Sequence, residues 1–231
     1  MDGWLARQDM LIGDAATKKL EGARVAVIGL GGVGGAALEA IARCGVGSIF
    51  VMDYDVFDAS NINRQILAFT DTVGLAKADV AALRVRAINS KAEVTAANEK
   101  FCAETAYLLR SFAPDFVVDA VDMVTAKLEI IELCKKENIP VISCMGTGNR
   151  LDAGSFCIGD IAETANGCGC PLARVMRREL KNRGIEGVTV LYGTDIPEKT
   201  GGDAPASIAF VPPVAGYLIA GHVIRSLIKE L

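Results

Sequence analysis

The sequence predicts an α/β fold, a doubly wound and mostly parallel sheet with a C-terminal strand and helix extension. Short apolar runs alternate with segments of helical periodicity through residues 24–145, a pattern typical of a parallel sheet covered by helices. The first apolar run leads into glycines and then into an Ala-rich segment, in the order strand, tight turn, helix. With 231 residues, 51% of them hydrophobic, the chain is long enough for one domain with a sizeable core.

Several short segments have the length and apolar pattern of strands. Residues 116–121 are apolar almost throughout, which is typical of a strand buried on both faces, whereas 93–97 alternates as a half-buried strand does. Asp53 directly follows the apolar segment at 48–52. In chain order, the expected strands are residues 24–28, 48–52, 93–97, 116–121, 140–145, 155–158 and 188–192.

Other segments have helical length and periodicity. The first follows the glycines, and the second repeats small apolar residues at helical spacing after a polar, irregular stretch at 55–72. Pro171 suits the first turn of the last of these helices. The expected helices are residues 33–44, 75–89, 103–111, 124–137 and 171–183.

The C-terminal third departs from this alternation. Residues 195–203 have the composition of a mobile loop. Residues 204–224 contain no Lys, Arg, Asp or Glu, but Pro212-Pro213, Gly216 and Gly221 interrupt them. We therefore expect a buried strand followed by a helix, at a dimer interface, rather than a membrane span.

The composition excludes several classes of protein. The chain has 24 Lys and Arg against 28 Asp and Glu, a net charge of −4, which argues against nucleic-acid binding by bulk charge. Its apolar content excludes a disordered or fibrous protein. Seven cysteines and no cationic, apolar leader at the N-terminus predict reduced thiols, no structural disulfides and a cytoplasmic location.

The run Gly29-Leu30-Gly31-Gly32-Val33-Gly34 satisfies G-x-G-x-x-G between an expected strand and an expected helix. Glycines there let backbone N–H groups approach a phosphate at the helix N-terminus. Asp53, 24 residues after Gly29, is placed to accept hydrogen bonds from ribose hydroxyls. These features predict a Rossmann-like nucleotide site; the plain alternative is that the glycines serve only a tight turn.

A nicotinamide dehydrogenase would share these features, so the residues after Asp53 decide the ligand. Arg64 and Lys77 would bring two cations to the carboxyl edge of the sheet, and Asp122 would end the strand expected at 116–121. ATP carries about four negative charges and a dinucleotide pyrophosphate about two, so two cations and a Mg²⁺ on Asp122 favour ATP. The only histidine, His222, lies in the apolar C-terminal segment, where a core position is expected rather than hydride-transfer catalysis.

Five elements in order resemble the ATP-binding constellation of the ubiquitin-activating-enzyme-like adenylating proteins. They are the glycine run, Asp53-Tyr54-Asp55, Asn61-Ile62-Asn63-Arg64-Gln65, Lys77 and Asp119-Ala120-Val121-Asp122. The resemblance implies catalytic roles for Arg64, Lys77 and Asp122, with Asp122 on Mg²⁺. It implies nucleotide binding by Gly29, Gly31, Gly32, Gly34, Asp53, Asp55, Asn61 and Gln65. Arg7, before the first strand, matches a superfamily arginine that reaches the triphosphate in the partner subunit of a homodimer.

Within the superfamily, residues 63–65, 74–78 and 171–174 look most like the tRNA threonylcarbamoyladenosine dehydratases, and this resemblance covers nearly the whole chain. It implies ATP-driven activation of the carboxylate on threonylcarbamoyl-adenosine in tRNA, followed by ring closure. The implied partners are tRNA and a second copy of the chain; a monovalent cation and a sulfur-transfer protein stay open. Members commonly carry Asp-Cys-Ala-Ser before the last apolar segment, whereas residues 203–207 contain no Cys, which puts a thiol role there in doubt.

We accordingly expect a single adenylating domain over residues 1–231. Its parts would be an N-terminal arm and helix (1–22), a nucleotide-binding core (23–150) and a substrate-binding, dimer-forming extension (151–231).

Two other functions remain open. One is an adenylyltransferase for the C-terminal Gly-Gly of a ubiquitin-like sulfur carrier. Such enzymes usually hold zinc on two Cys-x-x-Cys pairs, and Cys168-Gly169-Cys170 has no second pair, so zinc is not expected. The other is a non-catalytic nucleotide sensor or scaffold, against which the intact Arg64, Lys77 and Asp122 argue.

Four cations share one face of the expected helix at 171–183, because they fall at i, i+3, i+4 and i+7. They are Arg174, Arg177, Arg178 and Lys181. Such a stripe suits phosphates along an RNA backbone, and an ordinary solvated helix face is the equally weighted alternative.

Overall fold

In the computed structural model, which describes residues 3–201 and 205–229, a seven-stranded sheet has the strand order β3-β2-β1-β4-β5-β7-β6. Neighbouring strands are parallel except β6 and β7, which are antiparallel. The strands are β1 (Arg24–Ile28), β2 (Ser48–Met52), β3 (Glu93–Ala97), β4 (Phe116–Asp119), β5 (Val141–Cys144), β6 (Phe156–Asp160) and β7 (Thr189–Gly193). The predicted fold class is confirmed.

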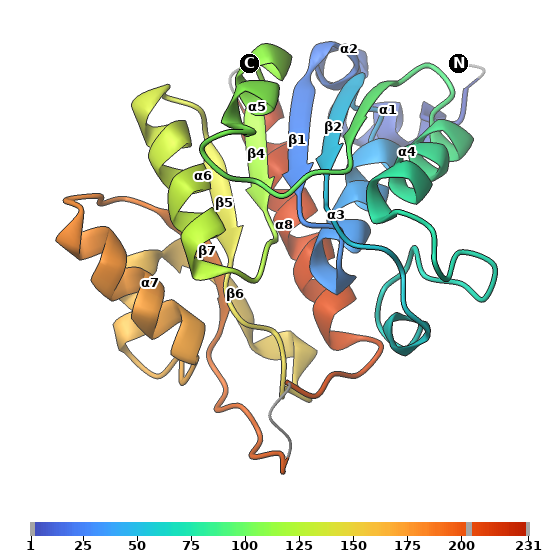
Figure 1. The fold of residues 1–231 in the computed structure, drawn as a ribbon. Coiled ribbons are helices and arrows are strands. Elements are labelled where there is room, and N and C mark those ends of the chain that lie inside the picture. The colour runs from blue at the N-terminus through green and yellow to red at the C-terminus, as the bar shows by residue number, and fades with distance from the viewer. Residues whose placement is uncertain (1–2, 202–204, 230–231) are drawn as a thin grey trace.

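Helices cover both faces of the sheet (Figure 1). Side chains of α3, α4 and α8 pack in a core with one face, and α5 and α6 pack against the other. A third cluster joins α6 to α7 beside β7. The helices are α1 (Ala6–Ile12), α2 (Asp14–Gly22), α3 (Gly32–Arg43), α4 (Lys77–Ile88), α5 (Ala106–Phe112), α6 (Val124–Lys136), α7 (Pro171–Asn182) and α8 (Val211–Ile228), with 3-10 turns η1 (Ala59–Asn61), η2 (Ala153–Ser155) and η3 (Ile161–Ala165).

Helix α8 packs directly on α3. A Cβ added to Gly216 would lie 2.3 Å from the carbonyl oxygen of Val33 and 2.8 Å from Cβ of Ala36, so only glycine permits this approach. By length and composition α8 is the one described helix that could span a membrane. Its packing against α3 accounts for its apolar composition, since Ala215, Ile219 and other residues on that side are buried.

His222 is a half-buried residue of α8, as expected. Its ring lies edge-on to Phe116, with 6.0 Å between the centroids. Burial, together with the charges of Arg225 and Lys229, lowers the pKa of His222.

Strand β4 is shorter than predicted and ends at Asp119 rather than at residue 121. The Asp119 side chain explains the difference: its Oδ1 accepts a hydrogen bond from the backbone N–H of Val121 at 3.2 Å, which turns the chain out of the sheet. Asp122 therefore lies in the loop between β4 and α6 and not at a strand end.

The prediction of a strand before α8 is also wrong for residues 205–210, which form no strand. Residue 204, where that prediction begins, lies outside the described residues. Their backbone groups bond elsewhere. The N–H of Ala206 donates to Asn149 Oδ1 at 2.6 Å, and the Ser207 carbonyl accepts from Asn63 Nδ2 at 3.2 Å.

Candidate active site

A cavity of about 900 Å³ opens at the carboxyl ends of β1 and β4. These neighbouring strands form the switch point of the sheet, where the chain connections leave in opposite directions and open α/β sheets bind ligands. One part of its lining, which we call the glycine-loop wall, contains Gly29, Gly31, Gly32, Asp53, Asp55, Asn61, Arg64, Gln65, Lys77 and Asp122. Another part, the second wall, is formed by residues 144–149, 169–172, 196–198 and 205–207.

Three glycines of the loop have separate structural reasons: two allow close backbone contacts within the protein, and one leaves open space above the loop. Gly29 has φ +88°, and a Cβ there would lie 2.7 Å from the Ala120 backbone. Gly34 does not line the cavity; a Cβ there would lie 1.8 Å from the Gly29 carbonyl oxygen, so this glycine lets the loop rest on α3. At Gly31 the nearest atom to an added Cβ is 4.0 Å away, which leaves the space above the loop open as a phosphate cradle requires.

Asp53 is 9% exposed and holds the loop in place. Its Oδ2 accepts from the backbone N–H of Leu30 at 2.6 Å, and its Oδ1 accepts from that of Asp55 at 2.9 Å. Each carboxylate oxygen can take a further hydrogen bond, so a ribose role is compatible with these contacts.

Two cations line the same wall. Lys77, at the start of α4, is 6% exposed, and its Nζ lies 3.1 Å from Oδ2 of Asp55. Arg64 is half-buried and donates to the Ser60 carbonyl and to Asn63 Oδ1, both at 2.9 Å. These contacts fix the directions of the side chains without using all of their donors.

Asp122 is exposed and lines the cavity, as do the carboxylates of Asp53 and Asp55. The charge of Asp55, with smaller contributions from burial, Asp122 and Asp53, raises the pKa of Tyr54. Within the described residues no three His, Cys, Asp or Glu side chains converge on a metal position. An exposed carboxylate on this wall suits Mg²⁺, which proteins usually hold with one or two carboxylates and the phosphates of the substrate.

Besides Asp9 Oδ1 on α1, two buried side-chain oxygens of the described residues have no hydrogen-bond partner: Gln65 Oε1 and Ser207 Oγ. Both residues line the cavity, Gln65 on the glycine-loop wall and Ser207 on the second wall. Buried polar atoms are normally satisfied, so these two are suited to a polar ligand that spans both walls.

Some predicted site residues lie outside the cavity lining. Arg7 is exposed on α1. On α7, Arg174, Arg178 and Lys181 are exposed, while Arg177 is half-buried and donates to Thr164 Oγ1 at 2.8 Å. The helix meets the cavity at its N-terminal end, where Cys170, Pro171 and Leu172 line the second wall.

All seven cysteines are free. Cys144 and Cys170 line the cavity, but burial raises the pKa of the Cys144 thiol to about 12, so it is not a thiolate at neutral pH. The Cys170 sulfur accepts from the backbone N–H of Ala173 at 3.5 Å and caps α7.

Sequence motifs point to only parts of the second wall, residues 171–172 and 205–207. Its first segment, residues 144–149, follows β5, and the carboxyl end of a parallel strand is the one signal that could have pointed to it.

The ThiF family model matches residues 5–230. The chain belongs to the ThiF family. A tRNA threonylcarbamoyladenosine dehydratase of Bacillus subtilis is 37% identical over 244 residues, covering 98% of this chain and 95% of the relative. A crystal structure of the Escherichia coli tRNA N6-threonylcarbamoyladenosine dehydratase in complex with ATP superposes with a TM-score of 0.91 at 31% identity, covering 100% of this chain and 97% of that one.

Another ThiF-family relative represents the alternative function. The sulfur carrier protein ThiS adenylyltransferase of Bacillus subtilis is 37% identical over 153 residues, but the match covers 64% of this chain and 45% of that protein. The dehydratase match thus covers nearly the whole chain, whereas the adenylyltransferase match covers 64% of it.

Proposed function

We propose that this ThiF-family protein is a cytoplasmic, ATP-dependent tRNA threonylcarbamoyladenosine dehydratase. It adenylates the carboxylate of threonylcarbamoyl-adenosine in tRNA and promotes its cyclisation. The observation that carries the proposal is one cavity of about 900 Å³ with two walls. One wall has the glycine loop, Arg64 and Lys77 for the phosphates of ATP, and the second wall adjoins it and can contact a second substrate. Similarity to dehydratases over nearly the whole chain supports this choice of second substrate.

The glycine-loop wall binds ATP. Backbone N–H groups at the start of α3 meet the phosphates, and Asp53 accepts hydrogen bonds from the ribose. Asn61 and Gln65 supply further polar contacts, and Asp55 keeps Lys77 directed into the site through their ion pair.

Adenylation places an oxygen of the substrate carboxylate in line with the α-phosphorus of ATP. A new O–P bond forms while the bond to pyrophosphate breaks, and Arg64 and Lys77 stabilise the negative charge on the phosphate oxygens. Mg²⁺ held by Asp122 would neutralise part of the triphosphate charge. No protein nucleophile is required, which agrees with the protonated Cys144 in the cavity.

Ring closure follows in the same cavity. The carbamoyl group of the same side chain attacks the activated carbonyl carbon, loses a proton and displaces AMP, so the nucleoside loses the equivalent of one water. The attack is intramolecular, and its high effective concentration lowers the barrier once the side chain is held in a folded conformation.

The functional unit in this proposal is a homodimer. Arg7 is exposed on α1 and lies outside the cavity of its own chain, and Met10 and Leu11 beside it are 80% and 84% exposed. An apolar helix face of this kind is suited to a partner subunit, to whose triphosphate Arg7 then extends.

The exposed cations of α7 bind tRNA. Arg174, Arg178 and Lys181 lie on the helix whose N-terminus forms part of the second wall, so phosphate contacts along α7 would direct the modified nucleoside toward the cavity.

The decisive experiment offers the protein both substrates. Purified protein is incubated with ATP, Mg²⁺ and tRNA that carries threonylcarbamoyl-adenosine, and the digested nucleosides are analysed by mass spectrometry. Loss of one water from that nucleoside is the expected result. An unchanged nucleoside, together with adenylation of a carrier protein that ends in Gly-Gly, would support the sulfur-carrier adenylyltransferase instead.

A further inference from the structure

We propose that Arg150 is a positioning residue, which fixes the second wall of the cavity and thereby sets the position of the modified nucleoside relative to ATP. This inference rests on the proposed function. Arg150 follows the cavity-lining segment 144–149 and does not itself line the cavity. Its side chain is fully buried.

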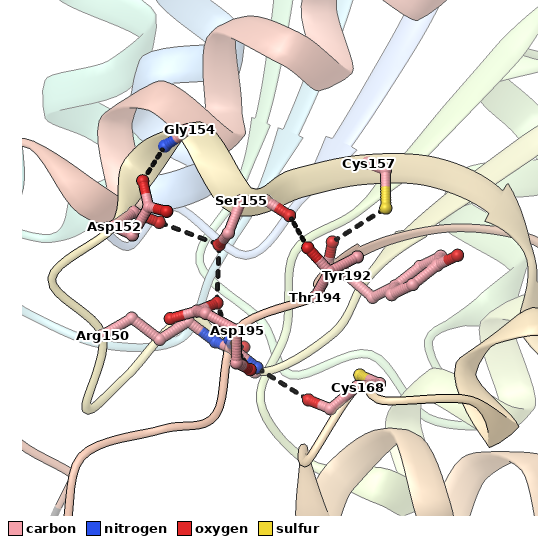
Figure 2. Close-up of polar contacts among 10 residues, drawn as sticks. Arg150, Asp152, Gly154, Ser155, Cys157, Cys168, Tyr192, Thr194 and Asp195 are labelled. Atoms are coloured by element: carbon pink, nitrogen blue, oxygen red, sulfur yellow. Dashed lines mark hydrogen bonds and ion pairs between the residues drawn. The ribbon is translucent and has the colours of Figure 1, made fainter.

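The guanidinium of Arg150 connects three segments of the second wall that are far apart in the sequence (Figure 2). Nη1 donates to the Asp195 carbonyl at 2.7 Å and forms an ion pair with the Asp195 carboxylate, and Nη2 donates to the Cys168 carbonyl at 3.1 Å. Asp195 directly precedes the lining residues 196–198, and Cys168 directly precedes the lining residues 169–172.

Neighbouring residues make this arrangement specific to arginine. Ser155 Oγ lies 2.5 Å from the Asp195 carboxylate and donates to it, so the carboxylate that neutralises Arg150 is itself held in place (Figure 2). A Cβ added to Gly193 would lie 2.5 Å from Nη1 of Arg150, so the end of β7 leaves space for the guanidinium only because it is glycine. A lysine has one ammonium group and cannot bond to both segments from the fork positions that arginine occupies.

A second set of contacts completes the wall. Asn149, at φ +59°, accepts at its carbonyl from the N–H of Glu198 at 2.6 Å and at its Oδ1 from the N–H of Ala206 at 2.6 Å. Two adjacent residues, Asn149 and Arg150, therefore hold the described part of the loop at 195–201, although its sequence predicts a mobile loop.

These contacts predict which substrate is affected when the Arg150 guanidinium is displaced. None of its hydrogen bonds reaches the glycine-loop wall, where ATP binds in our proposal. Displacing the guanidinium would release the second wall and the residues before α7 while Asp53, Arg64 and Lys77 keep their contacts. Small misplacements of a reacting group cost large factors in rate, so the loss should appear with the tRNA substrate rather than with ATP.

Two variants test this from different directions. Arg150→Lys keeps the charge but loses the fork, and Gly193→Ala keeps the arginine but fills its space. Arg24→Lys is the matched control, since Arg24 also donates to backbone carbonyls, those of Phe112 and Ala113, at the opposite edge of the sheet. Steady-state kinetics with modified tRNA, ATP titrations and hydrogen–deuterium exchange over residues 195–198 are measured for each.

In both test variants we expect kcat/KM for modified tRNA to fall about tenfold or more, an ATP Kd within about twofold of wild type, and faster exchange over 195–198. Arg24→Lys should show none of these changes. Unchanged kcat/KM for modified tRNA and unchanged exchange in both variants, or an equal loss of ATP affinity, would overturn the proposal. If wild-type protein does not dehydrate the nucleoside, the proposed function fails, and the exchange data alone decide whether Arg150 holds the wall.

Discussion

Asp53 shows how one side chain can serve both the fold and the site. Its position after β2 predicts a ribose contact, and the structure adds that both carboxylate oxygens hold backbone N–H groups, those of Leu30 and Asp55. The glycine loop is therefore held by a residue that directly follows the neighbouring strand β2. A substitution at Asp53 would change the loop and the ribose contact together, which makes it a poor test of either alone.

Asp122 offers a cleaner test at the residue scale, because it is exposed and lies in a loop. We predict that Asp122→Ala abolishes Mg²⁺-dependent activation, since Mg²⁺ would lose its protein carboxylate, while the melting temperature stays near that of wild type. Turnover is measured across a Mg²⁺ titration, with Asp71→Ala, an exposed turn residue outside the cavity, as control. Wild-type turnover with normal Mg²⁺ dependence would reject the role of Asp122.

The buried residues Asp119 and Arg150 mark where sequence reasoning stops. The glycine run, Asp53, Arg64 and Lys77 could be predicted because their chemistry is carried by local motifs, and all of them belong to one wall. Arg150 depends on Asp195, 45 positions further along, and Asp119 on Ser143, 24 positions along. Only the folded sheet brings such pairs together, so although Asp119 belongs to a local motif, neither pairing appears in a local pattern.

At the scale of elements, the contact between α3 and α8 depends on one glycine. Gly216→Ala should push the two helices apart, because the new Cβ meets the Val33 carbonyl oxygen, and lower the free energy of unfolding by roughly 1–3 kcal/mol. Gly221→Ala in the same helix is the control: its Cβ would meet only the mobile end of Arg225, at 3.2 Å. Urea denaturation compares them, and equal stability of the two variants would contradict the close packing.

Helix α7 gives a prediction about RNA. Charge reversal at Arg174 and Lys181, both exposed, should raise the KM for tRNA and reduce the logarithmic salt slope of binding by about one unit for each lost phosphate contact. ATP affinity should not change. Arg177 is left intact because its bond to Thr164 also supports η3.

The control for this experiment reverses Lys91 and Lys136, exposed residues that precede β3 and β5 at the amino edge of the sheet. Filter-binding titrations over a range of salt concentrations compare the two double variants. If the α7 variant keeps the wild-type salt slope of tRNA binding, α7 is not part of the RNA interface. Its cations then form an ordinary solvated helix face.

Element types were more predictable than element ends. Hydrophobic periodicity predicts β4 and α8, but the end of β4 depends on the Asp119 side chain, and residues 205–210 form no strand because Asn149 and Asn63 bond their backbone. Side-chain hydrogen bonds to the backbone compete with sheet ladders, and a period in the sequence does not record them.

At the scale of the whole molecule, the position of Arg7 predicts that activity requires two subunits. Arg7→Ala and Lys77→Ala proteins should each be nearly inactive, because each lacks a cation for the triphosphate. After subunit exchange, half of the dimers are mixed, and one site in each mixed dimer keeps both cations, so about a quarter of wild-type activity should return. No recovery despite demonstrated exchange would place Arg7 outside the partner's site.

If the substrate carboxylate is adenylated before the ring closes, one of its oxygens leaves with AMP, and isotope labelling can follow that oxygen. tRNA carrying threonylcarbamoyl-adenosine with ¹⁸O in its carboxylate is converted with unlabelled ATP, and the released AMP and pyrophosphate are analysed by mass spectrometry. Adenylation of the carboxylate predicts one ¹⁸O atom in AMP, because the oxygen that attacks the α-phosphorus leaves with it. Unlabelled AMP, with the ¹⁸O in pyrophosphate, phosphate or water, would contradict it.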